Sequence, residues 1–274
     1  MSVRRPPIEE RFPRPSVMGV VNVTPDSFSD GGVHFHRDAA VTAAWGMLDA
    51  GAAIVDVGGE STRPGSSGVG ADEELARVEP VLAELQGAPV SIDTSKAAVA
   101  RRALELGVEL VNDVTALRGD PELAGVAADA GCYLCLMHML GEPRTMQDDP
   151  QYEDVVSEVK RFLEERLAVA VAAGVREEHV CLDPGIGFGK TVEHNLELVR
   201  RLDELAALGR PVLVGFSRKS TLGKLTGDPA ARTGSAAASV GGAVAAFERG
   251  ATILRVHDVR EHVEALTVAR AVAG

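Results

Sequence analysis

The sequence predicts an α/β protein of the (β/α)8 type, a single TIM barrel, and three observations support this prediction. The chain has 274 residues, which is enough for one barrel of ~250 residues. It contains eight short, continuously apolar runs, which are typical of parallel strands buried on both faces. Segments with helical spacing of apolar residues fill the intervals, and eight such units favour a closed barrel over an open doubly wound sheet.

Each expected strand is followed by a segment with helical periodicity. The expected strands are residues 17–23, 54–57, 90–92, 110–111, 133–137, 180–182, 212–214 and 253–256. Examples of helical spacing are Ala40, Ala44, Met47 and Leu48 after the first strand, and Val263, Leu266 and Ala269 after the last. No linker or low-complexity run interrupts the chain after residue 16. We therefore expect one domain over residues 17–274.

Residues 1–16 differ in composition from the rest of the chain. They carry four arginines and four prolines, and they have no apolar segment long enough for a signal peptide or a membrane span. We expect them to form a disordered arm on a cytoplasmic protein.

Charge and cysteine content argue against several classes of function. The formal net charge of −12 argues against wholesale binding to nucleic acid or to an anionic membrane. Three cysteines are an odd number without disulfide spacing, which indicates a reducing compartment. Cys132 and Cys135 lie inside an apolar run, so we interpret them as buried strand residues rather than as a redox or metal site.

A glycine-rich turn follows the sixth expected strand. A phosphate loop with its lysine at Lys190 would need glycine where Pro184 stands, and a dinucleotide fingerprint beginning at Gly185 would need glycine at position 190. Both nucleotide-binding interpretations therefore fail. What remains is a carboxylate, Asp183, at the point where a strand ends and a flexible turn begins.

Polar residues stand at the end of every expected strand. The carboxyl ends of the strands share one face of a barrel, and catalytic groups lie on that face. In strand order the residues include Asn22, Asp56, Asp93, Asn112 with Asp113, His138, Asp183, Ser217 with Lys219, and Arg255 with His257. Any one of them could cap the following helix, but eight polar ends on one rim favour a site.

Four residues on this rim suit a flat heterocycle. Asp93, Asn112 and Asp183 offer oxygen acceptors and an amide to a ring that carries adjacent N–H donors. Lys219 can donate to a carbonyl or nitrogen on the other edge of the ring.

A second group on the rim suits a phosphorylated substituent. The first and eighth strands are neighbours in a closed barrel, so Asn22 should approach Arg255 and His257. Two cationic donors suit a phosphorylated group, and the amide oxygen suits Mg²⁺. Alternatively, His257 could be a satisfied buried histidine, and Arg63 in the second loop could be a solvated charge.

Seven motifs together resemble the dihydropteroate synthase family. They are NVTPDSFSDGG at residues 22–32, DVGGESTRPG at 56–65, SIDT at 91–94, NDV at 112–114, LDPGIGFGKT at 182–191, SRKS at 217–220 and RVHDV at 255–259. The resemblance extends from residue 17 to the C-terminus. It implies a barrel enzyme, usually a homodimer, that condenses 6-hydroxymethyl-7,8-dihydropterin diphosphate with p-aminobenzoate to give 7,8-dihydropteroate and diphosphate.

The resemblance also implies roles for individual residues. The pterin pocket would contain Asp93, Asn112, Asp183 and Lys219, with Met137 and Phe188 as apolar walls. The diphosphate and Mg²⁺ would contact Asn22, Arg255 and His257, with Asn22 as the metal ligand. Phe28, Thr62, Arg63, Pro64 and Ser220 would surround p-aminobenzoate. The residues expected to act in catalysis are Asp93, Asp183, Lys219, Arg255 and His257.

The expected mechanism needs no covalent enzyme intermediate. Diphosphate is a good leaving group once its growing charge is neutralised, and C–O cleavage leaves positive charge that Asp93 and Asp183 can stabilise. Sulfonamides should compete with p-aminobenzoate and bind poorly until pterin and diphosphate are present. We also expect the helix at residues 234–249, which is rich in Ala and Gly, to form the homodimer contact.

Two alternatives remain open. A methyltransferase-type pterin-binding barrel would share Asp93, Asn112 and Asp183, but it has no use for the motifs at residues 217–220 and 255–257. A non-catalytic pterin-binding protein would not need the intact motifs at residues 22–32 and 61–65.

Overall fold

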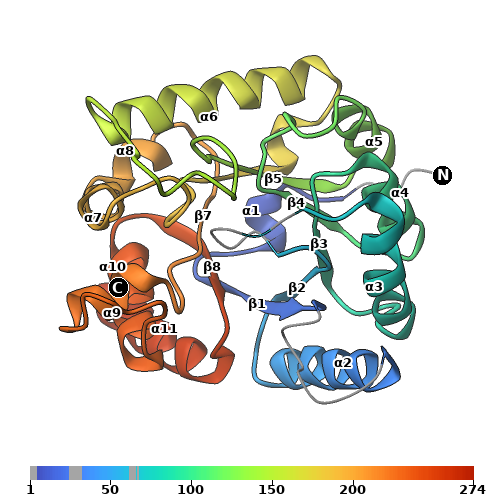
Figure 1. Cartoon of the computed structure of the whole chain (residues 1–274), viewed down its shortest axis with the longest axis horizontal. Coiled ribbons are helices and arrows are strands. Elements are labelled where there is room, and N and C mark those ends of the chain that lie inside the picture. The colour runs from blue at the N-terminus through green and yellow to red at the C-terminus, as the bar shows by residue number, and fades with distance from the viewer. Residues whose placement is uncertain (1–4, 25–32, 62–65, 67) are drawn as a thin grey trace.

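Eight parallel strands form a closed barrel in chain order, as the sequence predicts (Figure 1). The computed structural model of the chain describes residues 5–24, 33–61, 66 and 68–274. The strands are β1 (Ser16–Asn22), β2 (Ile54–Gly58), β3 (Val90–Asp93), β4 (Leu110–Asp113), β5 (Tyr133–Met137), β6 (Val180–Asp183), β7 (Val212–Val214) and β8 (Ala251–Val256). β5 and β7 have the predicted bounds, and the other strands differ from prediction by one or two residues at an end.

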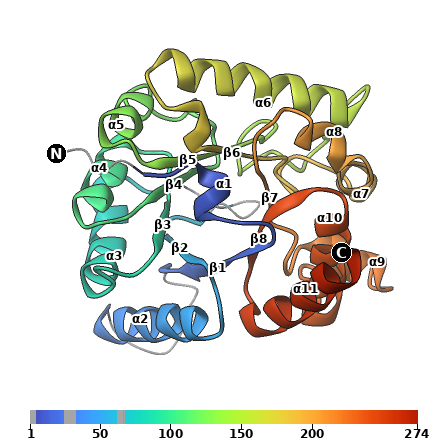
Figure 2. The same ribbon diagram turned by 180° about the vertical axis from the view of Figure 1, so that it is seen from behind.

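Helices cover the outside of the barrel (Figures 1 and 2). They are α2 (Val33–Asp49), α3 (Ala71–Glu84), α4 (Ala97–Glu105), α5 (Leu123–Ala130), α6 (Val155–Ala172), α7 (Val192–Arg200), α8 (Leu202–Ala206), α9 (Ser220–Leu225), α10 (Ala236–Glu248) and α11 (Val259–Ala273). The 3-10 helix η2 (Glu177–His179) precedes β6. In α6, Val155, Val159 and Leu163 recur at steps of four and are buried on the side that faces the barrel.

The register of the strands brings the ends of neighbouring strands to one level. Asn22 is paired with Gly58, Gly58 with Asp93, and Asp93 with Asn112. On the other side Met137 is paired with Asp183. Because parallel pairing fixes these positions, side chains that are far apart in sequence share the carboxyl rim of the barrel.

The prediction of a disordered arm is wrong for residues 5–16. They contain the helix α1 (Ile8–Arg11), which lies across the amino-terminal end of the barrel (Figure 2). Ile8 and Phe12 are fully buried there, and the rings of Phe12 and Tyr133 meet edge to face with centroids 5.7 Å apart. The prediction rested on the arginines and prolines of this segment. It did not take into account that Ile8 and Phe12 are four residues apart and therefore lie on one apolar face of a helix.

The three cysteines are buried and carry free thiols, which confirms that Cys132 and Cys135 are buried residues. Cys135 lies on β5 beside Cys181 on β6, in the apolar cluster that also contains Ile8 and Phe12. None of the helices in the described part of the chain combines the length and hydropathy of a membrane span.

Candidate active site

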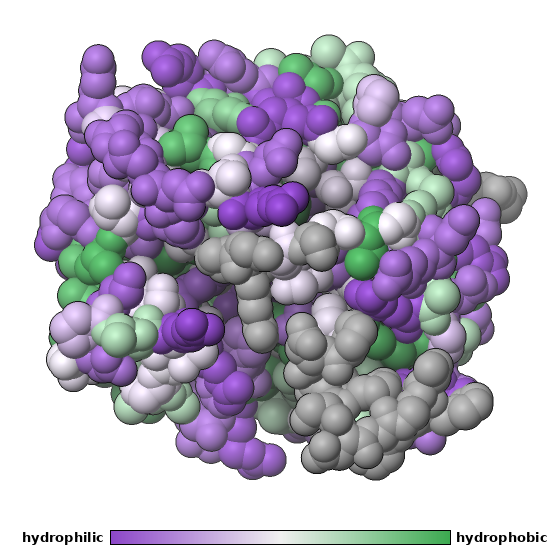
Figure 3. Space-filling model, viewed as in Figure 1, coloured by the Kyte–Doolittle hydropathy of each residue, from purple (hydrophilic) through white to green (hydrophobic). Residues whose placement is uncertain are grey.

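The carboxyl ends of the strands lead into a polar face. Figure 3 shows this face as largely hydrophilic and hollowed near its centre. Polar side chains buried at or next to these strand ends include Asp56 in the middle of β2, Asn112 on β4 and Asp183 at the end of β6. Buried polar groups are costly unless they have partners, so their concentration at one end of the barrel indicates a site.

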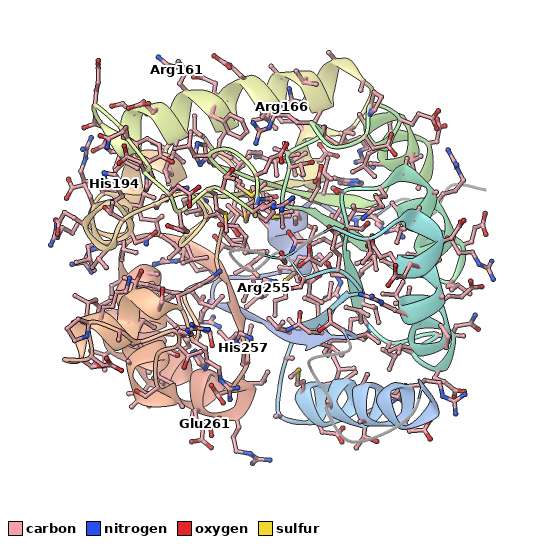
Figure 4. All side chains as sticks on the ribbon, in the orientation of Figure 1. Arg161, Arg166, His194, Arg255, His257 and Glu261 are labelled. Atoms are coloured by element: carbon pink, nitrogen blue, oxygen red, sulfur yellow. The ribbon has the colours of Figure 1, made fainter. Side chains whose placement is uncertain are left out.

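A hydrogen-bonded network joins four strands in this site. The Nε of Arg255 donates to Oδ2 of Asp56 at 2.7 Å, and its Nη2 donates to Oδ2 of Asp93 at 2.8 Å. The Nδ2 of Asn112 donates to the same Oδ2 of Asp56 at 2.9 Å. Figure 4 shows Arg255 near the centre of the barrel. The structure therefore brings together Asp93, Asn112 and Arg255, which the sequence assigned to two separate groups.

Burial shifts the ionisation of the two predicted carboxylates. It raises the pKa of Asp93 to about 7, although the neighbouring guanidinium of Arg255 opposes the shift. Burial also raises the pKa of Asp183 to about 6, against a hydrogen bond from Gly185 and the charge of Lys219. Two carboxylates that titrate near neutral pH inside one site are typical of a functional centre.

The turn after β6 requires glycine. Gly185 has a φ of +67°, and a Cβ at this position would lie 1.9 Å from the carbonyl oxygen of His138. The N–H of Gly185 donates to Oδ1 of Asp183 at 2.7 Å, and the N–H of Gly187 donates to Oδ1 of Asn195 at 2.8 Å. These bonds hold the turn and orient the Asp183 carboxylate.

The predicted apolar walls lie together beside this turn. Met137 packs in a small cluster with Met139 and Met146, and Phe188 packs against it. The Nζ of Lys219 lies 4.1 Å from the centroid of the Phe188 ring, which is a cation–π contact. Lys219 and Phe188 come from loops after different strands, so the structure places the predicted cation against the predicted aromatic wall.

A buried lysine supports the same turn, and sequence reasoning missed its role. Lys190 is 3% exposed, and its Nζ lies 2.9 Å from Nδ1 of His138 and donates to the carbonyl of Phe188 at 3.0 Å. Burial lowers the pKa of Lys190 to about 7 and that of His138 to about 2. The one available signal was that Lys190 ends the glycine-rich turn, and the sequence considered this lysine only as part of a nucleotide loop.

His257 follows β8 and is held by Ser217 of the loop after β7. Its Nδ1 lies 3.1 Å from Oγ of Ser217, and its backbone N–H donates to the same oxygen at 3.2 Å. Burial and the charge of Arg255 lower the pKa of His257 to about 4. The imidazole is therefore neutral at pH 7 in the free protein.

The loops after β7 and β8 are tied together next to His257. Arg218 has a left-handed backbone with φ of +56°, and its Nη2 pairs with Oδ1 of Asp258 at 2.5 Å. Ser220, a predicted p-aminobenzoate contact, begins α9 and is half-buried.

The structure describes only one of the remaining predicted residues, Asn22. Asn22 ends β1 and is half-buried, on the strand that pairs with β8. Phe28, Thr62, Arg63 and Pro64 lie outside the described residues. Within the described parts of the chain, no cluster of three or more His, Cys, Asp or Glu side chains could hold a metal ion.

Sequence relatives decide the family. The chain matches the pterin binding enzyme family over residues 18–257. The dihydropteroate synthase of Neisseria meningitidis serogroup C is 49% identical over 260 residues, which cover 92% of this chain and 91% of the relative. The chain belongs to the dihydropteroate synthase family. The dihydropteroate synthase of Escherichia coli strain K12 is 48% identical over 94% of this chain and 91% of its own length.

Solved dihydropteroate synthases have the same barrel. The Xanthomonas albilineans synthase with 4-aminobenzoic acid has a TM-score of 0.88 and 47% identity, covering 96% of this chain and 94% of its own. The same synthase in complex with 7,8-dihydropteroate has a TM-score of 0.85 and 44% identity, with 96% and 95% covered. The Yersinia pestis synthase in complex with a sulfonamide drug has a TM-score of 0.88 and 46% identity, with 95% and 94% covered.

Proposed function

We propose that this chain condenses 6-hydroxymethyl-7,8-dihydropterin diphosphate with p-aminobenzoate, giving 7,8-dihydropteroate and diphosphate. The observation that carries the proposal is the network in which Arg255 joins Asp93 to Asp56 and Asn112 at the mouth of the barrel. A network of this kind gives one site both acceptors for a flat ring and a cation for a leaving diphosphate.

The pterin ring would lie among Asp93, Asn112, Asp183 and Lys219. The carboxylate of Asp183 can accept hydrogen bonds from adjacent N–H donors on one edge of the ring. The N–H of Gly185 occupies only one acceptor position on Oδ1 of this carboxylate. Met137 and Phe188 would contact the faces of the ring. Lys219, already held against Phe188, would donate to the opposite edge.

The diphosphate would bind between β1 and β8. Arg255 supplies a guanidinium, and His257 is half-buried near Arg218 and Lys219, whose charges favour an anion there. As negative charge grows on the leaving diphosphate, these groups would stabilise it, and Asp93 and Asp183 would stabilise the positive charge left on the ring.

Asn22 is the proposed ligand of Mg²⁺. Its carboxamide oxygen is a hard donor at the end of β1, and a Mg²⁺ ion that keeps most of its waters needs only one or two protein ligands. The single amide therefore fits the ion. When bound, the ion would neutralise charge on the diphosphate.

The p-aminobenzoate site would lie at the outer part of the mouth. Ser220 at the start of α9 would contribute, together with Phe28, Thr62, Arg63 and Pro64 from outside the described residues. We propose that sulfonamides bind here in competition with p-aminobenzoate, as a sulfonamide drug is bound by the Yersinia pestis synthase.

We propose further that the protein is a cytoplasmic homodimer. Its three buried free thiols suit a reducing compartment. The small residues Ala236, Ala237 and Val240 of α10 line a shallow groove with Ala265 and Val268 of α11, and Val268 is 64% exposed. Sedimentation at micromolar concentration tests the dimer, and a monomer would contradict it.

The activity is tested by incubating the protein with the pterin diphosphate, p-aminobenzoate and Mg²⁺. Diphosphate and dihydropteroate should appear in equal amounts, and omission of p-aminobenzoate should abolish dihydropteroate formation. Tight binding of the pterin diphosphate without any turnover would instead indicate a non-catalytic pterin-binding protein.

A further inference from the structure

Asp56 is a fully buried carboxylate that the sequence placed on the rim without giving it a role. It lies in the middle of β2, between the buried residues Val55 and Val57, and its register partner on β3 is Ser91. Both of its hydrogen bonds use Oδ2, which accepts from Asn112 and from Arg255. Asp56 is thus the point at which the amide of β4 and the guanidinium of β8 are joined.

The contact with Asp56 fixes which way the Asn112 amide faces. A carboxylate paired with a guanidinium can only accept hydrogen bonds, so the group of Asn112 that faces it must be the NH2. The Oδ1 of Asn112 is then turned away from Asp56. It is buried and has no hydrogen-bond partner among the described residues.

A buried oxygen without a hydrogen-bond partner is free to accept a hydrogen bond from a bound ligand. Rotation of the amide would place its oxygen against the Asp56 carboxylate and leave two acceptors facing each other at 2.9 Å. Asp56 therefore prevents the rotation that would offer an NH2 group in place of the oxygen. The same carboxylate holds Nε of Arg255, whose Nη2 remains on Asp93.

We propose that Asp56 is a positioning residue that makes Asn112 an obligatory acceptor for an N–H group of the pterin ring. This inference rests on the proposed function, since it takes the pterin as the ligand of Asn112. Asp56 itself does not touch the ring. It acts by orienting the amide of Asn112 and by holding Nε of the Arg255 guanidinium.

The orientation of Asn112 is tested by NMR with ¹⁵N-labelled asparagine. The chain has three asparagines, Asn22, Asn112 and Asn195, so the side-chain NH2 signals are few. One Hδ2 signal of Asn112 should be shifted downfield by the Asp56 carboxylate, and Asp56→Ala should remove this shift. The signals of Asn195, whose Nδ2 donates to Thr221, should not change.

The matched control is Ser91→Ala. Ser91 is the register neighbour of Asp56, it is fully buried, and its Oγ has no partner among the described residues. Removing this hydroxyl changes the same layer of the barrel without touching Asn112 or Arg255. The Asn112 signals should therefore match those of the wild type.

Calorimetric titration with 6-hydroxymethyl-7,8-dihydropterin diphosphate tests the consequence. Asp56→Ala should raise the Kd by on the order of tenfold or more, because the amide can then turn its donor toward a ring donor. Asp56→Asn keeps an oxygen that both donors can reach, and it should stay within about threefold of the wild type. If Asp56→Ala does not fold, Asp56→Ser replaces it. The serine side chain is too short to reach either donor.

Unchanged Asn112 signals or an unchanged Kd in Asp56→Ala would overturn the proposal, as would an equal loss in Ser91→Ala. Absence of turnover in the wild type would instead count against the proposed function. The two failures are distinguishable because the NMR comparison does not depend on activity.

Discussion

The two ends of the barrel bury different kinds of side chain, apolar at the amino-terminal (lower) end and polar at the carboxyl (upper) end. At the amino-terminal end, Ile8 and Phe12 pack with Met18 of β1 in a fully buried apolar cluster. At the carboxyl end, Asp56 and Asp183 are equally buried but polar. Apolar burial stabilises a fold by about 25 cal/mol per Å², whereas burial of charge costs stability unless partners compensate. The comparison teaches that the amino-terminal end adds stability to the large apolar layer between strands and helices, while the carboxyl end is arranged for chemistry at some cost in stability.

The largest expected effect is on stability at the lower end. Phe12→Ala should lower the free energy of unfolding by about 3 to 5 kcal/mol, because it removes a fully buried ring packed on Tyr133. Urea unfolding measures the change, and Phe12→Leu should lose much less. The kcat/KM of the folded fraction should not change, so a loss of catalysis in Phe12→Leu would break the separation between the two ends.

At the upper end the effect should fall on activity. Asp183→Asn should lower kcat/KM by roughly 10- to 100-fold or more, because an amide presents a donor where ring donors already point, leaving buried groups unpaired. Steady-state kinetics measure the change. Asp203→Asn, an exposed carboxylate in α8, is the matched control and should leave kcat/KM unchanged. Equal kinetics for the two variants would remove Asp183 from the site.

The same variant gives a pH test of the stability cost. The folded-state pKa of Asp183 is raised to about 6 by burial, above the unfolded value of about 3.9. The folded state therefore binds the proton more tightly, and wild-type stability should fall by about 2 to 3 kcal/mol relative to Asp183→Asn as pH rises from 4 to 6. Unfolding curves at several pH values check this, and a parallel pH dependence in both proteins would contradict it.

A smaller effect concerns His257. Its pKa is lowered to about 4 by burial and by Arg255, so it is neutral in the free protein at pH 7. A bound diphosphate would add negative charge beside the ring and raise this pKa. Calorimetry in two buffers of different ionisation enthalpy should detect proton uptake at pH 6. In His257→Asn this uptake should be smaller, and identical uptake would exclude His257 as its source.

The comparison also explains what the sequence could predict. The strands of the barrel were predictable because residues such as Ile54, Val90 and Leu134 form continuous apolar runs that are buried on both faces. Asp93 and Asp183 were predictable because each stands at the end of such a run. The barrel itself then brings these ends together.

The errors have physical causes as well. Asp56 was placed on the rim but given no role, because its role depends on Asn112 and Arg255, which lie 56 and 199 residues away in sequence. The charge of His257 depends on its burial, which no local motif reports. The packing of Phe12 depends on residues such as Tyr133 and Leu213, which only the closed barrel brings together.

The most direct test measures how one substitution at each end of the barrel changes the binding of the same pterin ligand. Titration of 6-hydroxymethyl-7,8-dihydropterin diphosphate with Mg²⁺ into wild type, Phe12→Leu and Asp183→Asn gives three dissociation constants. The account predicts the same constant for wild type and Phe12→Leu, and a roughly 10- to 100-fold larger one for Asp183→Asn. Equal constants for wild type and Asp183→Asn would contradict a pterin site at the carboxyl end of the barrel.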